Sequence, residues 1–571
     1  MTTRDLTDLT EHEFGLFTGP DGPGDAGDGG DRGDGGAARG RRRRPGHRRA
    51  ARWWLVGLAA AVGWSLWSAG VGRQEVVNSG GWTVMGRFWR AAVSPELSSG
   101  FLRLTLDATL VTVAFAVLGT ALAVLLGLVG GVLTSETWWR RPGAGRTGGT
   151  GRRRDGLRPG WFVGRLANGL PRGVHEAVWG LFLVSILGRD PMVGVLAIAI
   201  PFGAVTAKVY ADLIDETARG PYEALRAAGS GRMAALAYAV FPVARAEIVS
   251  YAFYRFECSV RSAVILGMIG AGGLGFQLNL SFQSLRYEEM WTLIYALVAV
   301  SALADMWGAR LRRRASPGRV KASVVAAAVL VVASVVKLGP DVGRLVSAQT
   351  RRLAAEIAAS AWPPSLPVDG WAGLIRRSLE TVQMSLLAIA LASALAVGVA
   401  FVAARGGGGP ARRVAAAQAR AVLLLTRAIP PPVWALLVLF VVFPGPLPGA
   451  LALGIYNFGI LGRLMSEVVE NLDPRPALAL RALGAPAVSA FAYATLPMSA
   501  GRFAAYALYR WEVAARETVV VGVVGAGGLG RLLEQQRAAF DYSAMVGTVA
   551  ALIAVSVVID LVSAAARRSL R

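Results

Sequence analysis

The sequence predicts an all-α membrane protein of about 12 transmembrane helices, arranged as two tandem domains of six helices each. Hydrophobic residues make up 54% of the 571 residues and the mean hydropathy is +0.47, which is high for a soluble protein. Apolar runs of roughly 18–25 residues, long enough to cross a ~30 Å hydrocarbon core, lie between patches of charge. The third observation is an internal repeat that divides the chain into two halves.

The two halves align at a constant offset of 255 residues, without a gap, from Arg172 and Arg427 to Asp305 and Asp560. The same offset pairs Trp179 with Trp434, Lys208 with Arg463, Gly229 with Gly484, Pro242 with Pro497 and Tyr251 with Tyr506. Chance does not produce such a match over this length, so the chain holds two copies of one unit.

The repeat places the two domains at 52–315 and 316–571. The preceding segment, 1–51, is acidic and Gly-rich and then Arg-rich, which predicts a disordered cytoplasmic tail because it has too few apolar side chains to form a core. Upstream of the ungapped region, Leu106 aligns with Leu379 at an offset of 273. We therefore expect 18 extra residues in the first domain, in a Gly- and Arg-rich loop.

Each domain contains six candidate spans. Those of the first domain lie near 53–71, 105–133, 174–188, 193–213, 247–269 and 290–308. Those of the second lie near 322–339, 378–403, 421–443, 448–466, 502–524 and 544–563. The apolar run at 53–71 is expected to be a retained anchor, since no convincing cleavage site follows it.

Arginine clusters orient these spans, because basic loops stay on the cytoplasmic side. The clusters are at 39–52, Arg152–Arg154, Arg219/Arg226/Arg232, Arg310/Arg312/Arg313/Arg314 and Arg567/Arg568/Arg571. They predict a multi-pass protein of the cell membrane with both termini in the cytoplasm. Because each domain begins and ends on the same side, the two domains are parallel and would enclose a central path.

The composition also excludes several functions. The net charge is +23, but the basic residues flank apolar runs, so they favour a lipid bilayer over nucleic acid as the partner. The single cysteine, Cys258, cannot form an internal disulfide and belongs to no metal-binding spacing. The sequence has no P-loop, no catalytic triad and no cofactor motif, so we predict no catalytic residues, metal or cofactor.

A loop before the fifth span carries the first functional signal. Glu223 and Ala224 are followed by Gly229 and, 13 residues later, by Pro242. This pattern resembles the EAA loop of ABC-importer permeases, which implies a short helix that docks on a cytoplasmic ATPase. The alternative is an amphipathic helix lying at the membrane surface.

The second half keeps Ala479, Gly484 and Pro497 but has Leu478 where Glu223 stands. Either the two contacts with the ATPase are unequal, or the shape of the backbone matters more than the glutamate.

The fifth span carries the second signal. The residues concerned are Tyr254-Arg255-Phe256-Glu257, Arg261 and the run from Gly270 to Gly275, repeated as Tyr509-Arg510-Trp511-Glu512, Arg516 and the run from Gly525 to Gly530. This pattern resembles the phosphonate-importer permease family of the PhnE type, over most of both halves. The resemblance implies uptake of phosphonate or a related oxyanion, driven by two copies of a separate ATPase and fed by an extracytoplasmic binding protein.

The charges of the fifth span have two interpretations. Charged side chains inside a membrane are costly and usually functional. Glu257 and Arg261, like Glu512 and Arg516, are spaced i, i+4 and can form structural ion pairs. Alternatively, Arg255, Arg261, Arg510 and Arg516 lend positive potential to an anion path, because guanidinium groups match the oxygens of a phosphonate.

The glycine runs match G-x-G-x-x-G, but no strand precedes them, so we reject a dinucleotide site. Their glycines are Gly270, Gly272, Gly273 and Gly275, and Gly525, Gly527, Gly528 and Gly530. They either let helices pack closely or form an outer gate that exposes backbone N–H groups to the anion.

A secondary transporter with two parallel six-helix repeats is the alternative function. It explains the number of spans equally well, but not the repeated loop with its glycine and proline. A membrane-embedded enzyme has no support, since no acid–base pair is evident. The sequence does not distinguish phosphonate from phosphate or phosphite.

Overall fold

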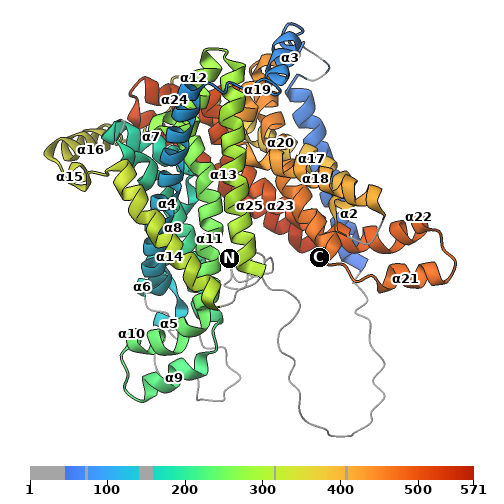
Figure 1. Cartoon of the computed structure of the whole chain (residues 1–571), viewed down its shortest axis with the longest axis horizontal. Helices are drawn as coiled ribbons and strands as arrows, with labels where there is room; N and C mark the ends of the chain where they lie inside the picture. The colour runs from blue at the N-terminus through green and yellow to red at the C-terminus, as the bar shows by residue number, and fades with distance from the viewer. Residues whose placement is uncertain are drawn as a thin grey trace. The chain divides into compact units, whose positions relative to one another are not determined.

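The computed structural model describes residues 45–70, 72, 75–139, 159–188, 190–313, 317–405 and 409–570. Most of the predicted tail and the arginines at 152–154 lie outside these residues. From residue 51 onward the chain forms one compact unit, and the description below concerns that unit (Figure 1). Its described residues are almost entirely helical, in agreement with the predicted fold class.

The first half consists of the following elements, where η marks a π-helix: α2 (Pro45–Ser68), α3 (Gly81–Ala91), α4 (Ser99–Thr134), α5 (Glu136–Trp139), α6 (Pro159–Gly173), α7 (Glu176–Leu187), α8 (Pro191–Glu216), α9 (Arg219–Ala227), α10 (Arg232–Ala235), η1 (Leu236–Val240), α11 (Phe241–Leu266), η2 (Gly267–Ala271), α12 (Gly273–Gln283) and α13 (Tyr287–Arg313).

The second half repeats this order, with α15 and α16 where the first half has α3, and without a counterpart of α5 among the described residues. Its elements are α14 (Pro317–Leu338), α15 (Val342–Leu345), α16 (Ala348–Ser360), α17 (Gly370–Ala403), α18 (Pro410–Ala428), α19 (Pro431–Val441), α20 (Pro446–Glu470), α21 (Arg475–Ala482), α22 (Ala487–Ala490), η3 (Phe491–Thr495), α23 (Leu496–Val521), η4 (Gly522–Ala526), α24 (Gly528–Ala538) and α25 (Tyr542–Leu570).

Eight of the described helices are long and apolar enough to cross a membrane, or up to 11 spans if each bent pair counts as one. The apolar part of α2, Val56–Ser68, is a shorter helix. The third span predicted at 174–188 corresponds to α7, and a further helix, α6, precedes it at a bend. The third span of the second half, predicted at 421–443, is not one continuous helix. Helices α6 and α7 meet at 85°, and α18 and α19 meet at 94°. Pro430, Pro431 and Pro432 account for the second bend, because proline cannot continue a helix.

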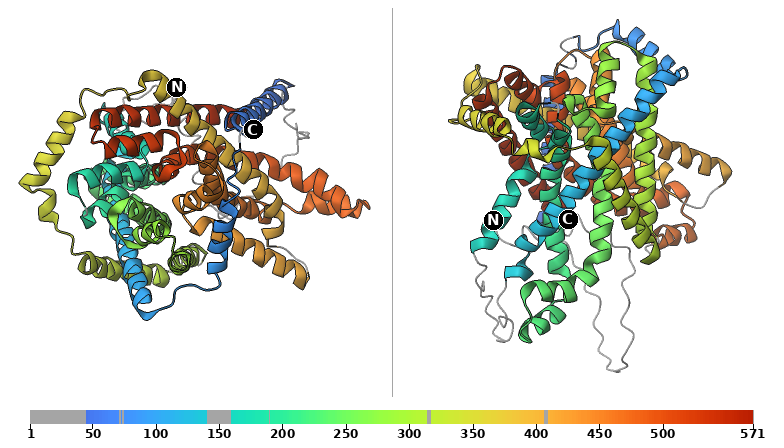
Figure 2. Two further views of the ribbon diagram at one scale, coloured as in Figure 1. Left: turned by 90° about the horizontal axis from the view of Figure 1, so that it is seen from above. Right: turned by 60° about the vertical axis from the view of Figure 1, so that its left-hand side comes forward.

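The first helix of each half packs against the other half. Trp54 and Leu58 of α2 pack on Leu508 and Trp511 of α23, and the view from above shows α2 beside the end of α25 (Figure 2, left). Conversely, α14 runs along α4, where Val331 joins the apolar core of the first half. The sequence boundary between α13 and α14 therefore separates the repeats but not the packed bundles.

The register of α4 against α17 corrects the predicted offset of 273. Thr112 accepts a hydrogen bond from the backbone N–H of Leu274 at 2.8 Å, and Thr381 accepts one from Leu529 at 3.0 Å. Because Leu274 and Leu529 are equivalent, Thr112 and Thr381 are equivalent too, at an offset of 269. The buried positions of the two helices coincide at that offset. The first half therefore carries 14 extra residues, the difference between 269 and 255, and the match of two leucines one turn away was misleading.

Candidate functional site

The two loops that precede the fifth spans have the same backbone geometry. Gly229 ends α9 with a φ of 88° and Gly484 ends α21 with a φ of 86°. At each end the glycine N–H donates to the carbonyl three residues back and the next N–H to the carbonyl five back, at 3.0–3.2 Å. This is the Schellman motif, in which a residue with positive φ stops the helix. The predicted short helices are therefore present in both halves.

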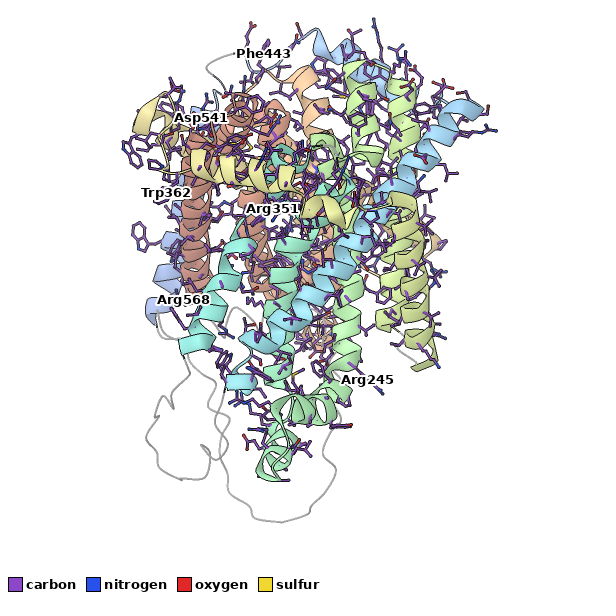
Figure 3. All side chains as sticks on the ribbon, turned by 90° about the vertical axis from the view of Figure 1, so that its left-hand side faces the viewer. Arg245, Arg351, Trp362, Phe443, Asp541 and Arg568 are labelled. Atoms are coloured by element: carbon purple, nitrogen blue, oxygen red, sulfur yellow. The ribbon has the colours of Figure 1, made fainter. Side chains whose placement is uncertain are left out.

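Both loop helices lie at the same end of the molecule. In Figure 1 α9 and α21 are near the bottom, whereas α12 and α24 are near the top, and the right-hand view of Figure 2 again places α9 and α10 at the lower end. Figure 3 places Arg245 of α11 toward the α9 end, and Phe443 and Asp541, which lie in turns of the second half, toward the other end. Both fifth spans therefore run in the same direction.

The two loop helices differ in how they are anchored. Tyr222 of α9 is buried among Val132, Ile214 and Leu236. Its counterpart in α21 is Ala477, and none of the described side chains of α21 is buried. Burial raises the pKa of Tyr222, as expected when the charged phenolate would be desolvated.

The exposed positions of the two loop helices differ as well. Glu223 is exposed, and so is the leucine that replaces it, Leu478, at 59%.

Pro242 and Pro497 each follow a π-helix. Pro242 is at the start of α11 after η1, and Pro497 is at the start of α23 after η3. Proline lacks the N–H that an uninterrupted α-helix would use, and a π-helical turn re-routes the hydrogen bonds around it. The two prolines thus mark a break at which each loop joins its span.

Charged residues of the fifth span form a cluster between the halves. Asp305 of α13 is ion-paired with Arg427, which belongs to the second half. Glu257 and Arg261 line the same small pocket as this pair, and Arg261 lies 3.8 Å from the sulfur of Cys258. We call Glu257, Arg261, Asp305 and Arg427 the first interface cluster.

Its counterpart at the offset of 255 consists of Glu512, Arg516, Asp560 and Arg172, which we call the second interface cluster. The charges of the other three residues act on the Asp560 carboxyl group. The i, i+4 ion pair, one of the two interpretations of the sequence, does not form between Glu512 and Arg516. The Glu512 carboxylate binds Arg567 at 2.5 Å, while Arg516 donates to the Glu512 backbone carbonyl. Because α25 runs alongside α23, Arg567 reaches the carboxylate from a neighbouring helix, which spacing within one helix cannot reveal.

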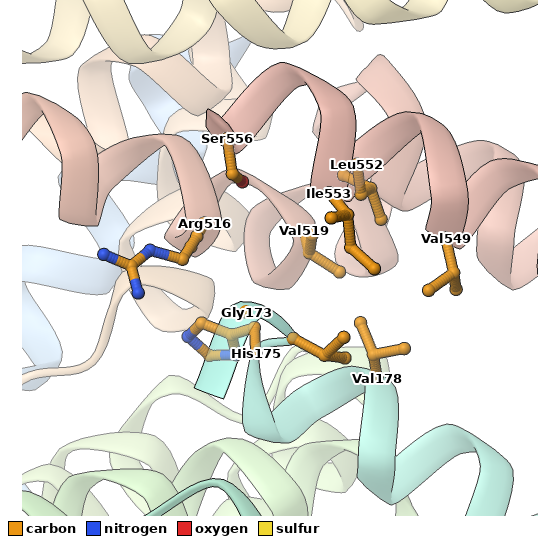
Figure 4. A pocket seen from close by; sticks show the side chains of 10 residues that line it. Gly173, His175, Val178, Arg516, Val519, Val549, Leu552, Ile553 and Ser556 are labelled. Carbon is orange, nitrogen blue, oxygen red and sulfur yellow. The ribbon is translucent and has the colours of Figure 1, made fainter. Parts of the chain in front are cut away.

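A pocket lies beside each cluster, and the two pockets are related by the repeat. The pocket in Figure 4 is lined by Gly173, Val174, His175, Val178, Arg516, Val519, Val549, Leu552, Ile553 and Ser556. Three of the residues at the first cluster are the equivalents of Gly173, Arg516 and Ser556, namely Ala428, Arg261 and Ser301. In both pockets the halves meet at an arginine of the fifth span.

The remaining arginine of each fifth span has a different environment in each half. Arg510 is 8% exposed, and it donates to Glu517 at 3.0 Å and to Asn457 at 2.8 Å. Arg255, its equivalent, donates from Nε and Nη2 to the hydroxyl of Tyr251. Sequence reasoning missed Glu517 and Asn457. The signal available was a carboxylate seven residues after Arg510, two helical turns along the same face.

The glycine runs form a sharp turn and a close contact. Gly270 and Gly272 have φ values of 119° and 106°, and the second run has the same geometry. A Cβ on Gly275 would lie 1.9 Å from the carbonyl oxygen of Val264. Close packing therefore explains the glycine at 275, and the positive φ explains the glycines at 270 and 272. The second run offers fewer N–H groups to an anion, since Glu380 accepts from Gly528.

Comparisons with known proteins agree on a family. Residues 163–318 and 396–571 each match the family described as binding-protein-dependent transport system inner membrane component. The chain is 30% identical over 379 residues to a phosphate-import permease protein, PhnE, of Mycolicibacterium smegmatis, which covers 63% of this chain and 69% of that one. It is 32% identical over 214 residues to the phosphite transport system permease protein PtxC of Stutzerimonas stutzeri, covering 38% and 76%.

Two further similarities are more local. The putative cryptic phosphonate transport system permease protein PhnE2 of Escherichia coli is 32% identical over 118 residues, which is 21% of this chain and 97% of that one. Among solved structures, an inward-facing MetNI methionine ABC transporter matches 38% of this chain and 98% of its own, at 22% identity and a TM-score of 0.30.

Proposed function

Because the chain belongs to the binding-protein-dependent transport system inner membrane components, as two PhnE-type permease domains fused in tandem, we propose that it imports a phosphorus oxyanion, such as phosphonate, phosphite or phosphate. In this proposal ATP is hydrolysed on a separate subunit, present in two copies. An extracytoplasmic binding protein delivers the anion. The relatives are permeases for phosphate, phosphite and phosphonate by name, which supports this class of substrate.

The observation that carries the proposal is the repeated loop helix. Both α9 and α21 lie at one end of the molecule and end in the same turn, as two contacts with two copies of one motor require. The loop residues proposed to couple to the ATPase are Glu223, Ala224, Gly229, Pro242, Ala479, Gly484 and Pro497. Tyr238 and Tyr493, which are equivalent, are each 80% exposed beside these helices and supply apolar area to such a contact.

Movement of the loops would reach the spans through the π-helices. Each loop helix continues through a short helix and a π-helix into the fifth span, with a proline at the joint. The break lets the loop rotate relative to the span, as π-helical and proline-containing turns bend more readily than an α-helix. We propose that this joint converts closure of the ATPases into alternating access, with the α9 end in the cytoplasm.

The path itself lies along α11 and α23 in this proposal. Its charged residues are Arg255, Glu257, Arg261, Arg510, Glu512 and Arg516. The two interface clusters hold the halves together beside it, Arg510 is ion-paired with Glu517, and Arg255 attracts the anion. The glycine runs at the far end of the same helices are the proposed outer gate, with Gly270 and Gly525 in the turn.

Reconstitution tests the proposal directly. The purified chain in liposomes, with its partner ATPase and binding protein added, should take up phosphonate, phosphite or phosphate only when ATP is present on the loop-helix side. Uptake without any ATPase, driven by an ion gradient, would instead establish a secondary transporter. Gly229→Val and Gly484→Val, which strain a positive φ, should uncouple ATP hydrolysis from uptake. A matched change at Gly501, whose Cβ would have open space, serves as the control.

A further inference from the structure

The halves differ at one buried charge. Arg255 and Arg510 occupy equivalent positions in α11 and α23, yet the residues around them are not equivalent. At the offset of 255, Glu517 corresponds to Ser262 and Asn457 corresponds to Phe202. The second half thus has a carboxylate and an amide where the first half has a hydroxyl and an aromatic ring.

Arg510 is neutralised within its own half. Its Nη2 donates to both oxygens of Glu517 at 3.0 and 3.3 Å, and its Nε donates to Asn457 at 2.8 Å. Asn457 also donates to Glu517 at 3.3 Å, so the three side chains close a hydrogen-bonded triangle. The Glu517 carboxylate therefore neutralises the Arg510 guanidinium, and the hydrogen bonds fix its position. A neutralised guanidinium attracts a passing anion only weakly.

Arg255 is surrounded by aromatic rings instead. Its guanidinium carbon lies 4.9–5.6 Å from the ring centres of Tyr251, Tyr254 and Phe202. Its Nε and Nη2 both donate hydrogen bonds to the Tyr251 hydroxyl. In the described part of the chain no carboxylate lies within ion-pair distance of the Arg255 guanidinium. The hydroxyl of Ser262, the equivalent of Glu517, donates a hydrogen bond to Glu176 at 2.7 Å. The Arg255 charge is therefore held by ring faces and a hydroxyl.

This arrangement leaves the guanidinium without a countercharge, which a bound anion would supply. A charged arginine inside a span is costly, and the three ring faces offset that cost without neutralising the charge. Nη1 of Arg255 donates no hydrogen bond to any residue that the structure describes. A tetrahedral oxyanion suits it, because its oxygens accept charge-assisted hydrogen bonds from a guanidinium.

The helix that carries Arg255, α11, lies against the second half, since Glu257 and Arg261 share a pocket with Arg427. Arg261, two turns farther along α11, is in range of Tyr456 of the second half. Toward the glycine-run end, the equivalent residues Ile265 and Val520 pack together, about 15 Å along the helix from Arg255.

From these observations, and resting on the function proposed above, we infer that the translocation path holds one oxyanion site, built by the first half alone. Arg255 is the anion-binding residue, and Tyr251, Tyr254 and Phe202 hold its guanidinium in place. Arg510, with Glu517 and Asn457, is a structural element and not a second site. Two fused copies of one unit thus form an asymmetric path.

The protein contains a natural reporter for this site. Cys258, the only cysteine in the sequence, lies one turn after Arg255 and is partly exposed. Its reaction with an anionic thiol reagent, sulfonatoethyl methanethiosulfonate, can be compared with its reaction with the cationic trimethylammonium analogue, in vesicles open to both faces. The inference predicts faster labelling by the anionic reagent and slower labelling when inorganic phosphate or methylphosphonate is added.

Variants separate the two arginines. Arg255→Gln should lower the ratio of anionic to cationic labelling about tenfold, as expected for loss of a unit charge about 6 Å away at a dielectric constant near 80, because the charge acts on the two reagents with opposite sign. It should also abolish protection by phosphate. Arg255→Lys should keep most of the ratio. The control is the double variant Arg510→Gln/Glu517→Gln, which removes the second pair without leaving a lone buried charge, and which should label like the wild type.

Three results would overturn the inference: equal labelling by both reagents in the wild type, an equal loss in the Arg510→Gln/Glu517→Gln variant, or a Cys258 that no reagent reaches from either face. Labelling requires neither ATPase nor binding protein, so it tests the site even if the proposed importer function fails. In reconstituted uptake, Arg255→Gln should reduce the rate at least tenfold and the double variant less than threefold. Equal reductions would indicate two equivalent sites.

Discussion

The ion pair between Arg427 and Asp305 offers the sharpest test of how the two halves are held together. Arg427 belongs to the bent third element of the second half and Asp305 to α13 of the first. Their side chains are 13% and 19% exposed, so the pair is largely removed from water. We predict that Arg427→Ala weakens the association of the halves and lowers the free energy of unfolding.

The size of the effect follows from what remains after the substitution. Removing one partner of a buried ion pair costs about 3–5 kcal/mol, because the other charge stays buried. Asp305 also lies in electrostatic range of Arg261 and Arg463, which compensate part of its charge. We therefore expect a loss of about 2–3 kcal/mol, somewhat below the range for a fully isolated charge.

A double-mutant cycle isolates the pair. Unfolding of Arg427→Ala, Asp305→Ala and the double variant would be followed in mixed micelles by tryptophan fluorescence as sodium dodecyl sulfate is increased. The coupling energy should reach about 1–2 kcal/mol. Asp369→Asn is the matched control, because the Asp369–Arg376 pair is 64% and 60% exposed and such pairs contribute about 0–1 kcal/mol. A coupling energy below about 0.5 kcal/mol would refute the view that this pair joins the halves.

Three further predictions concern the loops and the glycine turn. Gly275→Ala should prevent correct folding, seen as loss of the monodisperse peak in size-exclusion chromatography, because its Cβ would overlap the Val264 carbonyl at 1.9 Å, whereas Gly501→Ala should be neutral or stabilise by about 0.5–1 kcal/mol; normal folding of the first variant would contradict the packing role. Tyr222→Ala should destabilise α9 by about 3–5 kcal/mol at most, seen as faster hydrogen exchange confined to that loop, and unchanged exchange would show that the buried ring does not anchor it. Leu478→Glu should raise the affinity for the ATPase if the glutamate contributes to docking, and unchanged binding in a pull-down titration would assign docking to backbone shape.

The repeat was the part of the fold that the sequence revealed best. An ungapped offset over more than a hundred residues predicts two equivalent sets of helices, and the structure contains both sets. The loop helices were predicted as well, because a glycine at a helix end requires a positive φ whatever the tertiary context. These features are local or periodic, and such features are encoded in residue spacing.

Other features depend on contacts between distant segments, and spacing does not encode them. The apolar run at 421–443 looks continuous, but Pro430 and its neighbours bend the chain by 94°. The packing of α2 on the second half and of α14 on the first half cannot be read from the sequence, because an apolar helix face can pack against either bundle. Its spacing allows Glu512 to pair with Arg516 of its own helix, yet the carboxylate pairs with Arg567 of α25.

The differences between the halves point to a consequence of fusion. Two identical subunits around a twofold axis must carry the same residue at every equivalent position, so a carboxylate that neutralises one arginine would neutralise both. A fused chain encodes each half separately. Ser262 can therefore differ from Glu517, and the anchored Tyr222 from Ala477, while the glycines and prolines that shape both loops stay the same. If Arg255 is the sole anion site, replacing Ser262 with Glu and Phe202 with Asn should transplant the neutralising triangle and abolish uptake while the loops remain intact; retained uptake would show that the charge of Arg255 is not needed.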